Sequence, residues 1–442
     1  MSTVFLIKAF QLILSLAILV VLHELGHFIP AKLFKTKVEK FYLFFDWPYS
    51  LFKKKIGDTE YGIGILPLGG YVKIAGMIDE SMDTEHLNKE PEPWEFRSKP
   101  AWQRLIIMLG GIAVNFFLGF AIYAMVASVW GKTILTNENL SNGFEVSELM
   151  KSYGFKDGDK VLKVDGEDLE NVLDINKFLF LRNVSEVRVE HISGKEENIS
   201  VPENIDEIMF EKGAVLSFLP LRSPTLLDSV IPNSNAYKAG LLKGDRIINI
   251  NGTDVAKWDK FSELVELNTS PNLDLKIKRG NKIIDYTVPL DEDNKIGVVM
   301  ANMNQLVPTE IKYSFIESIH DGFDRAYWEL LDYVGQFKHV FTKKGASQLG
   351  GFAAIGNLFP AEWSWKDFWE TTALLSIILA FMNALPIPAL DGGHVMFLVY
   401  EVVSGSKPND KFMEYAQITG FFLLIGLVLF ANGNDIVRFL FN

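Results

Sequence analysis

Four long apolar runs alternate with polar segments along the chain. The runs cover residues 5–28, 105–130, 368–389 and 412–431. Each is long enough for a helix to cross the hydrocarbon core of a bilayer, which takes about 20 residues. A secretory signal peptide is the alternative for the first run, but no small-residue cleavage site follows it. The pattern predicts a polytopic α-helical membrane protein with four transmembrane helices.

The polar segment between the second and third runs contains an internal repeat. Residues 154–166 match residues 240–252 at a constant offset of 86 positions. Each copy has a Gly-Asp turn, an alternating strand and a second glycine turn, which together make one supersecondary unit. The repeat predicts two small β-rich domains in tandem. An unrelated pair of β-hairpins is the alternative.

A third pattern follows the repeat. Apolar residues recur every three or four positions over residues 309–341, which is typical of an amphipathic helix or helix pair. Such a segment can lie on the outer surface of the membrane. Packing of the segment against the preceding β-rich domain is an equally good interpretation.

Charge and composition restrict the possible partners. Of the formal net charge of −12, the segment 131–367 contributes −10, from 27 Lys and Arg against 37 Asp and Glu. Nucleic-acid binding needs clustered basic residues, so we expect no nucleic-acid partner. The chain has no cysteine, so any metal must be held by histidines and carboxylates.

The positions of the basic residues predict the topology. Lysines and arginines flank the loop between the first two runs and the short loop between the last two, at Lys32, Lys35, Lys37, Lys40, Arg97, Lys99, Arg104, Lys407 and Lys411. Basic loops stay in the cytoplasm. We therefore expect a multi-pass membrane protein with both termini and the acidic insert on the external side.

The first apolar run ends in the sequence His23-Glu24-Leu25-Gly26-His27. Histidines at positions i and i+4 lie on one helix face and can bind one Zn²⁺, which leaves Glu24 to act on the water at the metal. Ionisable residues inside a membrane are costly and mark functional sites. The motif predicts a catalytic zinc site, and the alternative is a pair of structural histidines.

A catalytic zinc normally has three protein ligands, so one more residue is needed. The third apolar run ends in a segment that contains Pro386, Pro388 and Asp391. Prolines break a helix, and irregular backbone at membrane depth is tolerated only inside the protein or beside a cavity. Asp391 is therefore the predicted third ligand. His394 is the rival, and its other role would be to hydrogen-bond or cap the broken helix.

These motifs resemble those of the site-2 protease family of intramembrane metalloproteases. His-Glu-x-x-His in the first run and Asn-x-x-Pro-x-Pro-x-Leu-Asp-Gly from Asn383 onward carry the resemblance. The repeat, which resembles the PDZ signature, makes the chain similar to the bacterial regulator of sigma-E protease branch. The resemblance implies that His23, His27 and Asp391 bind zinc, that Glu24 is the catalytic base and that Asn383 assists substrate handling.

Two further segments are similar to this family. Residues 61–77 resemble its membrane-associated β-hairpin loop, and residues 110–115 resemble its second-span motif, although Ile112 stands where the family usually has proline. The resemblance suggests substrate contacts at Gly69, Gly70, Asn115 and Pro386.

The predicted organisation has eight segments. They are the first transmembrane helix with the zinc motif (1–34), a cytoplasmic loop with the β-hairpin (35–99), the second helix (100–131), two PDZ-like domains (132–221 and 222–305), an amphipathic surface segment (306–366), the third helix with the aspartate motif (367–403) and the fourth helix with the C-terminus (404–442).

The sequence as a whole predicts an intramembrane zinc endopeptidase. The resemblance implies a location in the bacterial inner membrane. It also implies membrane-embedded single-pass substrates that another protease has trimmed, such as anti-sigma factors or remnant signal peptides, with the PDZ-like domains gating access. A catalytically silent PDZ adaptor and a metal transporter or sensor are the alternatives. A transporter should show ligand pairs along a path, and the sequence shows one cluster.

Overall fold

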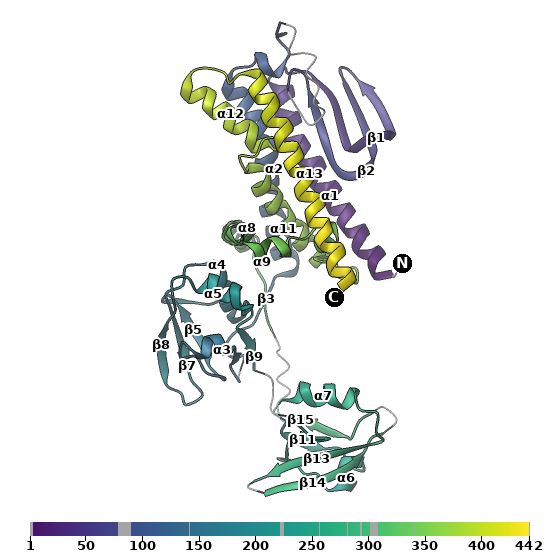
Figure 1. The fold of residues 1–442 in the computed structure, drawn as a ribbon, viewed down its shortest axis with the longest axis vertical. Coiled ribbons are helices and arrows are strands. Elements are labelled where there is room, and N and C mark those ends of the chain that lie inside the picture. Colours follow the sequence, from purple (N-terminus) through teal and green to yellow (C-terminus); the bar gives the residue numbers. More distant parts are fainter. Residues whose placement is uncertain are drawn as a thin grey trace. The chain divides into compact units, whose positions relative to one another are not determined.

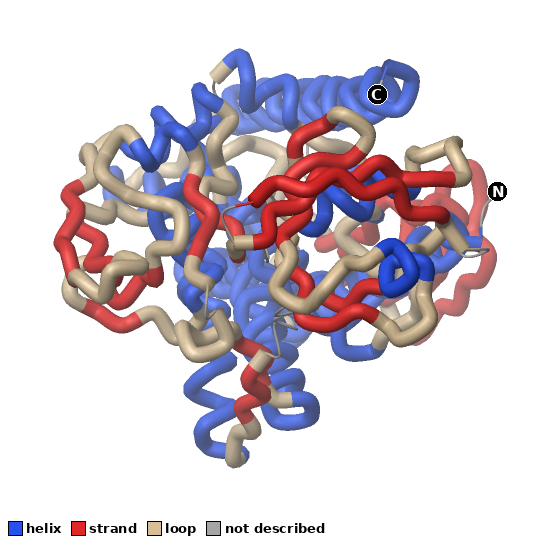
Figure 2. Tube along the Cα trace, turned by 90° about the horizontal axis from the view of Figure 1, so that it is seen from below, coloured by secondary structure: helices blue, strands red, loops and turns tan. Residues whose placement is uncertain are grey.

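A computed structural model describes residues 3–77, 90–140, 142–221, 225–255, 257–280, 282–291, 294–300, 308–340 and 342–441. The chain forms two compact units. Unit 1 contains Met1–Gly131 and Lys312–Asn442, and unit 2 contains Lys132–Ile311. Helices dominate unit 1 and strands dominate unit 2 (Figures 1 and 2).

Within the described residues, three helices are long and apolar enough to cross a membrane. They are α1 (Thr3–Leu33), α2 (Ala101–Trp130) and most of α13 (Asp410–Phe441). The remaining predicted span, 368–389, is not among them. Its helix, α11 (Trp365–Ala384), has 20 residues and carries Asp367 and Glu370 near its start. The structure thus supports three of the four predicted spans by length and composition.

The chain breaks after α11 where its prolines occur. Pro386 and Pro388 lie in the segment between Ala384 and α12 (Asp391–Ser404). Proline has no amide hydrogen and disfavours helical backbone in the residue before it, so a helix cannot run through this segment undisturbed. The stretch 367–403, which we predicted as a third transmembrane helix broken at its prolines, is two helices with an irregular loop between them.

Helices α1 and α2 approach each other through glycines. A Cβ added to Gly26 would lie 2.4 Å from the carbonyl oxygen of Gly110, and one added to Gly110 would lie 1.9 Å from that of Gly26. Small residues of this kind let membrane helices pack backbone to backbone. The contact brings α2 directly beside the part of α1 that carries the histidine motif.

The loop between α1 and α2 contains the predicted hairpin, β1 (Val38–Ile56) and β2 (Thr59–Ile74). Both strands bend, so that residues 40–43 pair with 60–63 on one side and with 70–73 on the other, while 52–56 pair with 59–63. The result is a small sheet in the order 50–56, 59–64, 38–45, 66–74 (Figure 1). No described strand pairs with the outer side of 66–74, which is therefore an edge.

The amphipathic stretch after the repeat contains α8 (Phe315–Val340), followed by the short helices α9 (Lys343–Gln348) and α10 (Phe352–Gly356). Helix α8 packs against α2, because Gly322 lies against Ala124 and the Arg325 guanidinium lies 4.5 Å from the centre of the Tyr123 ring. Arg325 also pairs with Glu370 of α11 at 3.3 Å. Within unit 1 the partners of α8 are thus helices.

Unit 2 shows the repeat as two copies of one strand order. One sheet has the order β6-β5-β7-β8 and the other β12-β11-β13-β14. In both copies the aspartate of the Gly-Asp turn accepts the backbone N–H three residues before it, from Lys156 to Asp159 and from Leu242 to Asp245, each at 2.8 Å. Each copy also has its own buried apolar core. Unit 2 therefore contains two four-stranded sheets of the same strand order, each with its own apolar core.

The first copy consists of β4 (Phe144–Val146), α3 (Glu148–Lys151), β5 (Lys160–Val164), β6 (Glu167–Asp168), α4 (Ile175–Leu181), β7 (Glu186–Glu190), β8 (Glu196–Ser200), α5 (Ile205–Lys212) and β9 (Phe218–Pro220). The second consists of β10 (Leu227–Val230), α6 (Asn235–Ala239), β11 (Arg246–Ile250), β12 (Thr253–Asp254), α7 (Trp258–Glu266), β13 (Asn272–Arg279), β14 (Lys282–Pro289) and β15 (Val298–Met300). The entry strand β3 (Lys132–Ile134) pairs with the exit strand β16 (Thr309–Ile311).

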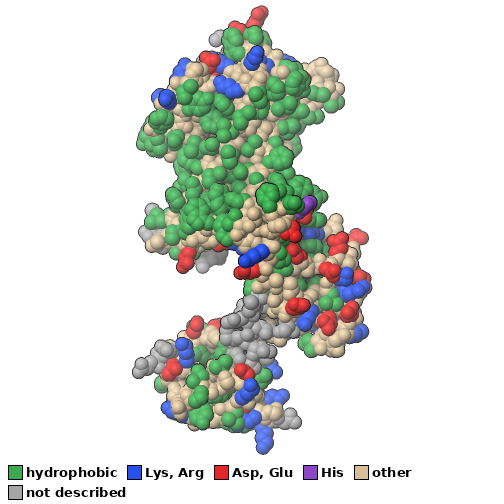
Figure 3. Space-filling view, turned by 180° about the vertical axis from the view of Figure 1, so that it is seen from behind, with side chains coloured by type: hydrophobic (Ala, Val, Ile, Leu, Met, Phe, Trp, Pro, Cys, Tyr) green, Lys and Arg blue, Asp and Glu red, His purple; other side chains and the backbone are tan. Residues whose placement is uncertain are grey.

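The two basic loops of unit 1 lie close to each other. The N- and C-termini lie at one end (Figure 1). The two basic loops meet away from the termini, where Lys407 Nζ donates to the carbonyl oxygen of Arg97 at 2.9 Å and Lys99 Nζ to that of Lys35 at 3.3 Å. Apolar side chains cover most of the face of the unit between the ends (Figure 3).

Candidate metal centre

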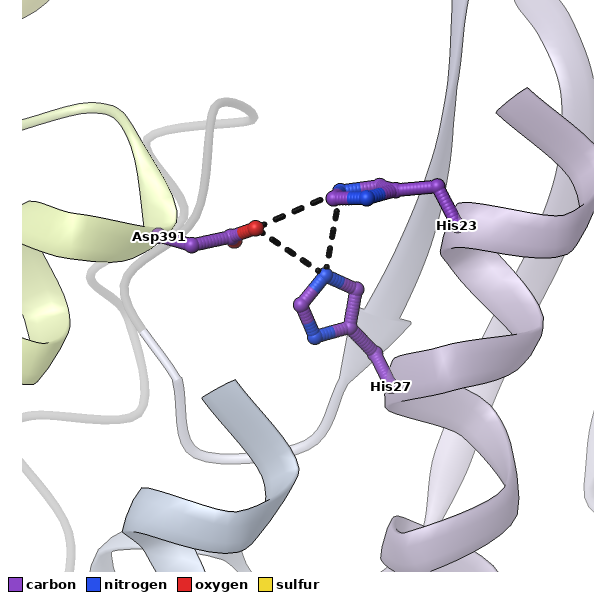
Figure 4. Close-up of side chains that lie close together, drawn as sticks. All are labelled: His23, His27 and Asp391. Atoms are coloured by element: carbon purple, nitrogen blue, oxygen red, sulfur yellow. Dashed lines mark hydrogen bonds and ion pairs between the residues drawn. The ribbon is translucent and has the colours of Figure 1, made fainter. Parts of the chain in front are cut away.

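Three side chains with metal-binding atoms meet inside unit 1. His23 and His27 lie one turn apart on α1, and Asp391 is the first residue of α12 (Figure 4). Asp391 Oδ2 is 3.2 Å from His23 Nε2 and 3.3 Å from His27 Nε2. The two Nε2 atoms are 3.2 Å apart. Residues more than 360 positions apart in the sequence thus form a nearly equilateral triangle of ligand atoms.

The size of this triangle fits zinc. A tetrahedral zinc with bonds of about 2.0–2.1 Å has ligand atoms about 3.3–3.4 Å apart. In addition, Asp391 Oδ2 is buried and accepts no hydrogen bond of ordinary geometry from any described residue. A buried carboxylate oxygen needs a partner, and a cation held by the three side chains would supply one.

The remaining imidazole nitrogens have partners that orient the rings. His27 Nδ1 donates to the carbonyl oxygen of Ile107 on α2 at 2.8 Å, which leaves the Nε2 lone pair for a metal. The side-chain amide of Asn115 lies 3.2 Å from His23 Nδ1. The backbone at Asn115 is tied to α11, because Ser376 Oγ donates to the backbone carbonyl oxygen of Asn115 at 2.6 Å. Both rings are thus held from α2.

Glycine at position 111 leaves room for the imidazoles. A Cβ added to Gly111 would lie 2.3 Å from His27 Nε2 and 2.6 Å from His23 Cε1. These distances are far below van der Waals contact, so the backbone of α2 forms one wall of the site. Helix α2 runs without interruption from Ala101 to Trp130. This agrees with Ile112, since the proline that the similar motif usually has at this position would disturb the helix.

Two further polar side chains lie beside the triangle. The Glu24 carboxylate lies beside the backbone N–H of Val72 in β2. The Asn383 side-chain amide, near the end of α11, lies 3.3 Å from His23 Nε2. The Asn383 amide is therefore next to the ligand atoms and close to any group bound at the metal.

The other predicted residues are not among the three ligand-bearing side chains. Gly70 lies between α1 and the sheet, since its added Cβ would be 2.6 Å from both Val20 Cγ1 and the Tyr42 carbonyl oxygen. Gly69 precedes it in β2, and Pro386 lies in the loop before α12. His394 is not part of the triangle. Its Nε2 lies 3.4 Å from the Gln417 side-chain nitrogen on α13.

Sequence reasoning missed three contributors to the site. The Ile107 carbonyl group and the space beside Gly111 contribute only because α2 packs against α1. The residue types isoleucine and glycine do not by themselves indicate such a role. Gln417 does leave one, because it is a buried amide within the apolar run of α13, and polar residues in such runs mark functional positions.

Comparison with known proteins agrees with this geometry. The sequence pattern of Peptidase family M50 matches residues 11–427, which is most of the chain. The chain belongs to peptidase family M50. This M50 peptidase is 28% identical to the regulator of sigma E protease of Haemophilus influenzae, over 96% of the chain and 98% of the relative. It is 27% identical to the regulator of sigma-E protease RseP of Escherichia coli strain K12, over 96% and 97%.

This M50 peptidase is also 27% identical to a Neisseria meningitidis protein that is named as a zinc metalloprotease. The match covers 97% of this peptidase and 98% of the relative. The predicted membership of the site-2 protease family, the peptidase activity and the zinc cofactor are confirmed by these matches.

Proposed function

We propose that this M50 peptidase cleaves transmembrane segments of single-pass membrane proteins at a zinc site formed by His23, His27 and Asp391. The observation that carries the proposal is the triangle of ligand atoms with sides of 3.2–3.3 Å, built on a helix that is apolar and long enough to span a bilayer. A hydrolytic metal centre on such a helix acts on peptide bonds that lie within the membrane.

Each side chain then has a defined role. The two imidazoles and the Asp391 carboxylate hold the metal. When bound, zinc supplies Lewis-acid chemistry, which activates a water and polarises a carbonyl group. Glu24 lies on α1 between the two histidines and is not one of the three ligands, so its carboxylate is free to take the proton of the attacking water and pass it to the leaving amine. The Val72 amide lies beside this carboxylate.

Asn383 is assigned to the substrate. Once the Nε2 lone pair of His23 is used for the metal, the neighbouring Asn383 amide has no acceptor there and can donate to a carbonyl group of the substrate or to the oxyanion. Asn115 has a supporting role instead. Its side-chain nitrogen lies 3.2 Å from His23 Nδ1, and a 180° turn of the amide would present its oxygen to the proton that ligation through Nε2 leaves on Nδ1.

The edge strand 66–74 is the proposed substrate platform. A helical substrate hides its carbonyl groups in backbone hydrogen bonds, so it must unwind before hydrolysis. An unwound segment inside a membrane needs new backbone partners, and an edge strand provides them by β-addition. The strand contains Gly69 and Gly70, and its Val72 contacts Glu24, so a peptide added there would lie beside the catalytic carboxylate.

The proposed topology has four spans in the bacterial inner membrane, with α11 and α12 together forming the third. The two basic loops are assigned to the cytoplasm. Both termini and unit 2 are assigned to the external side, and the exposed apolar residues Phe315, Ile316 and Phe323 of α8 are assigned to the outer membrane surface.

The two β-rich domains are proposed to be PDZ-like and to gate access. Relatives of this peptidase are named regulators of sigma-E protease, so anti-sigma factors are the proposed substrate class, together with remnant signal peptides. A substrate with a large external domain would be excluded until another protease has removed that domain.

The test is to measure zinc content and cleavage of a model transmembrane peptide with the wild type and with Glu24→Gln. We expect Glu24→Gln to keep one zinc and to lose cleavage, because amide replaces carboxylate without removing a ligand. His23→Ala is the matched control and should lose both. Equal zinc loss in the two variants would contradict the assigned roles, and cleavage by Glu24→Gln at the wild-type rate would contradict the proposed mechanism.

A further inference from the structure

The loop that presents Asp391 is under conformational strain. Ala389, two residues before Asp391, has a φ angle of +77° and is buried. This left-handed conformation is unfavourable for any residue with a Cβ and persists only when its surroundings enforce it. The loop therefore needs an external restraint to keep Asp391 where the histidines are.

Helix α13 supplies such a restraint. The Gln417 side chain is only 4% exposed, and its Oε1 accepts a hydrogen bond from the backbone N–H of Ala389 at 3.1 Å. Three residues further along the same helix face, Gly420 approaches the loop so closely that an added Cβ would be 1.9 Å from the carbonyl oxygen of Pro388. The loop is thus held by one hydrogen bond and pressed against the backbone of α13.

The same loop is confined from the other side. Added Cβ atoms at Gly392 and Gly393, in the first turn of α12, would lie 2.2 Å from the carbonyl oxygen of Leu385 and 2.6 Å from that of Ile387. The Gln417 side chain also reaches His394 in this turn, with its nitrogen 3.4 Å from His394 Nε2. One side chain of α13 therefore contacts both the strained residue and the helix that begins with Asp391.

We infer that Gln417 is a positioning residue of the metal centre, which holds Ala389 in the left-handed conformation and so fixes the Asp391 carboxylate opposite the two imidazoles. This inference rests on the proposed function of the three ligands. It gives α13, which contributes no ligand, a part in metal binding that acts through the loop before Asp391.

The inference makes an unusual prediction, namely rescue by glycine. Gln417→Leu replaces the amide, which accepts the hydrogen bond, by an apolar side chain of similar size. We expect zinc affinity and turnover to fall by about tenfold or more, as for other residues that orient ligands. Ala389→Gly in the Gln417→Leu background should restore most of both, because glycine adopts positive φ without a steric penalty. If Gln417 only helped to dock α13, glycine at position 389 would restore nothing.

The experiment uses the full chain in detergent. Zinc content is measured after dialysis against a weak chelator, turnover on the model peptide, and backbone hydrogen exchange of residues 385–391 on the chelator-stripped protein. We expect faster exchange in Gln417→Leu and slower exchange again in the double variant. Thr419→Ala is the control, since its exposed hydroxyl bonds only to Tyr415 of its own helix at 2.8 Å, and it should behave as wild type.

The outcomes separate this inference from the proposed function. Wild-type protein that binds no zinc at His23, His27 and Asp391 would overturn the proposed function itself. A zinc-loaded wild type together with a Gln417→Leu variant of unchanged zinc affinity would overturn only the role of Gln417. The same holds for a weakened Gln417→Leu that Ala389→Gly fails to restore. If Gln417→Leu does not fold, Gln417→Asn, which keeps the amide but shortens its reach, takes its place with the same expected rescue.

Discussion

Placing a methyl group on α2 at position 111 should empty the metal centre. The Cβ of Gly111→Ala would lie 2.3 Å from His27 Nε2 and 2.6 Å from His23 Cε1. Ordinary contact begins near 3.4 Å, so the His27 ring would have to move by about 1.1 Å. Metal sites hold their ligand distances within about 0.2 Å. The required movement is several times larger, and the ring is also tied to Ile107.

We expect Gly111→Ala to lose at least about 100-fold in zinc affinity, the upper end of what changes around ligands cause, and to lose peptide cleavage in parallel. Metal analysis after dialysis and a cleavage assay on a transmembrane peptide measure the two effects. Alanine in a helix is more favourable than glycine by about 1 kcal/mol, which offsets part of the destabilisation that the displaced ring causes in the metal-free protein.

Gly426→Ala on α13 is the matched control, because no described atom lies within 4 Å of its added Cβ, and it should keep zinc and activity. A Gly111→Ala variant with one tightly bound zinc and normal turnover would show that α2 does not approach the imidazoles as described.

Three other predictions concern the third ligand, the topology and the gate. Asp391→Asn should weaken zinc retention and abolish cleavage while His394→Ala retains the metal, and the reverse result in metal analysis would make His394 the ligand. Cysteines introduced at Ser185 and Ser406 of this cysteine-free chain should differ in intact cells, with an impermeant reagent labelling only the first; labelling of Ser406 alone would invert the topology. Deleting residues 143–299 and joining the ends by a flexible linker should permit cleavage of substrates that keep a large external domain, and an unchanged size preference in a folded, zinc-loaded variant would exclude the gate.

The central part of the site could be read from the sequence because its geometry is local. Histidines four positions apart on a helix must face the same way, and in the structure their Nε2 atoms are 3.2 Å apart. Asp391 could be found for a related reason: prolines interrupt an apolar run, and an acid beside such a break needs a partner. Both inferences use only spacing and the cost of burying polar groups.

The rest depends on contacts between distant segments. The wall formed by Gly111 exists only because α2 meets α1 at Gly26 and Gly110. The loop that connects these two helices forms a sheet of four strand segments, where the sequence suggested a hairpin. The four segments arise because β1 bends near Phe44, whose φ angle is +67°. An aromatic residue at positive φ is rare, so the bend could not be predicted from the residue type at this position. The amphipathic pattern likewise predicted the helix α8. It did not predict that α8 contacts Ala124 and Tyr123 of α2.

Pairing of the entry and exit strands of unit 2 has a mechanical consequence. Thr309, Glu310 and Ile311 form a ladder with Ile134, Thr133 and Lys132, so the insert leaves unit 1 by a two-stranded ribbon and not by two separate tethers. Strands joined by backbone hydrogen bonds turn and tilt together. A force on the insert would therefore reach α2 and α8 together, and α2 is the helix whose backbone touches the imidazoles.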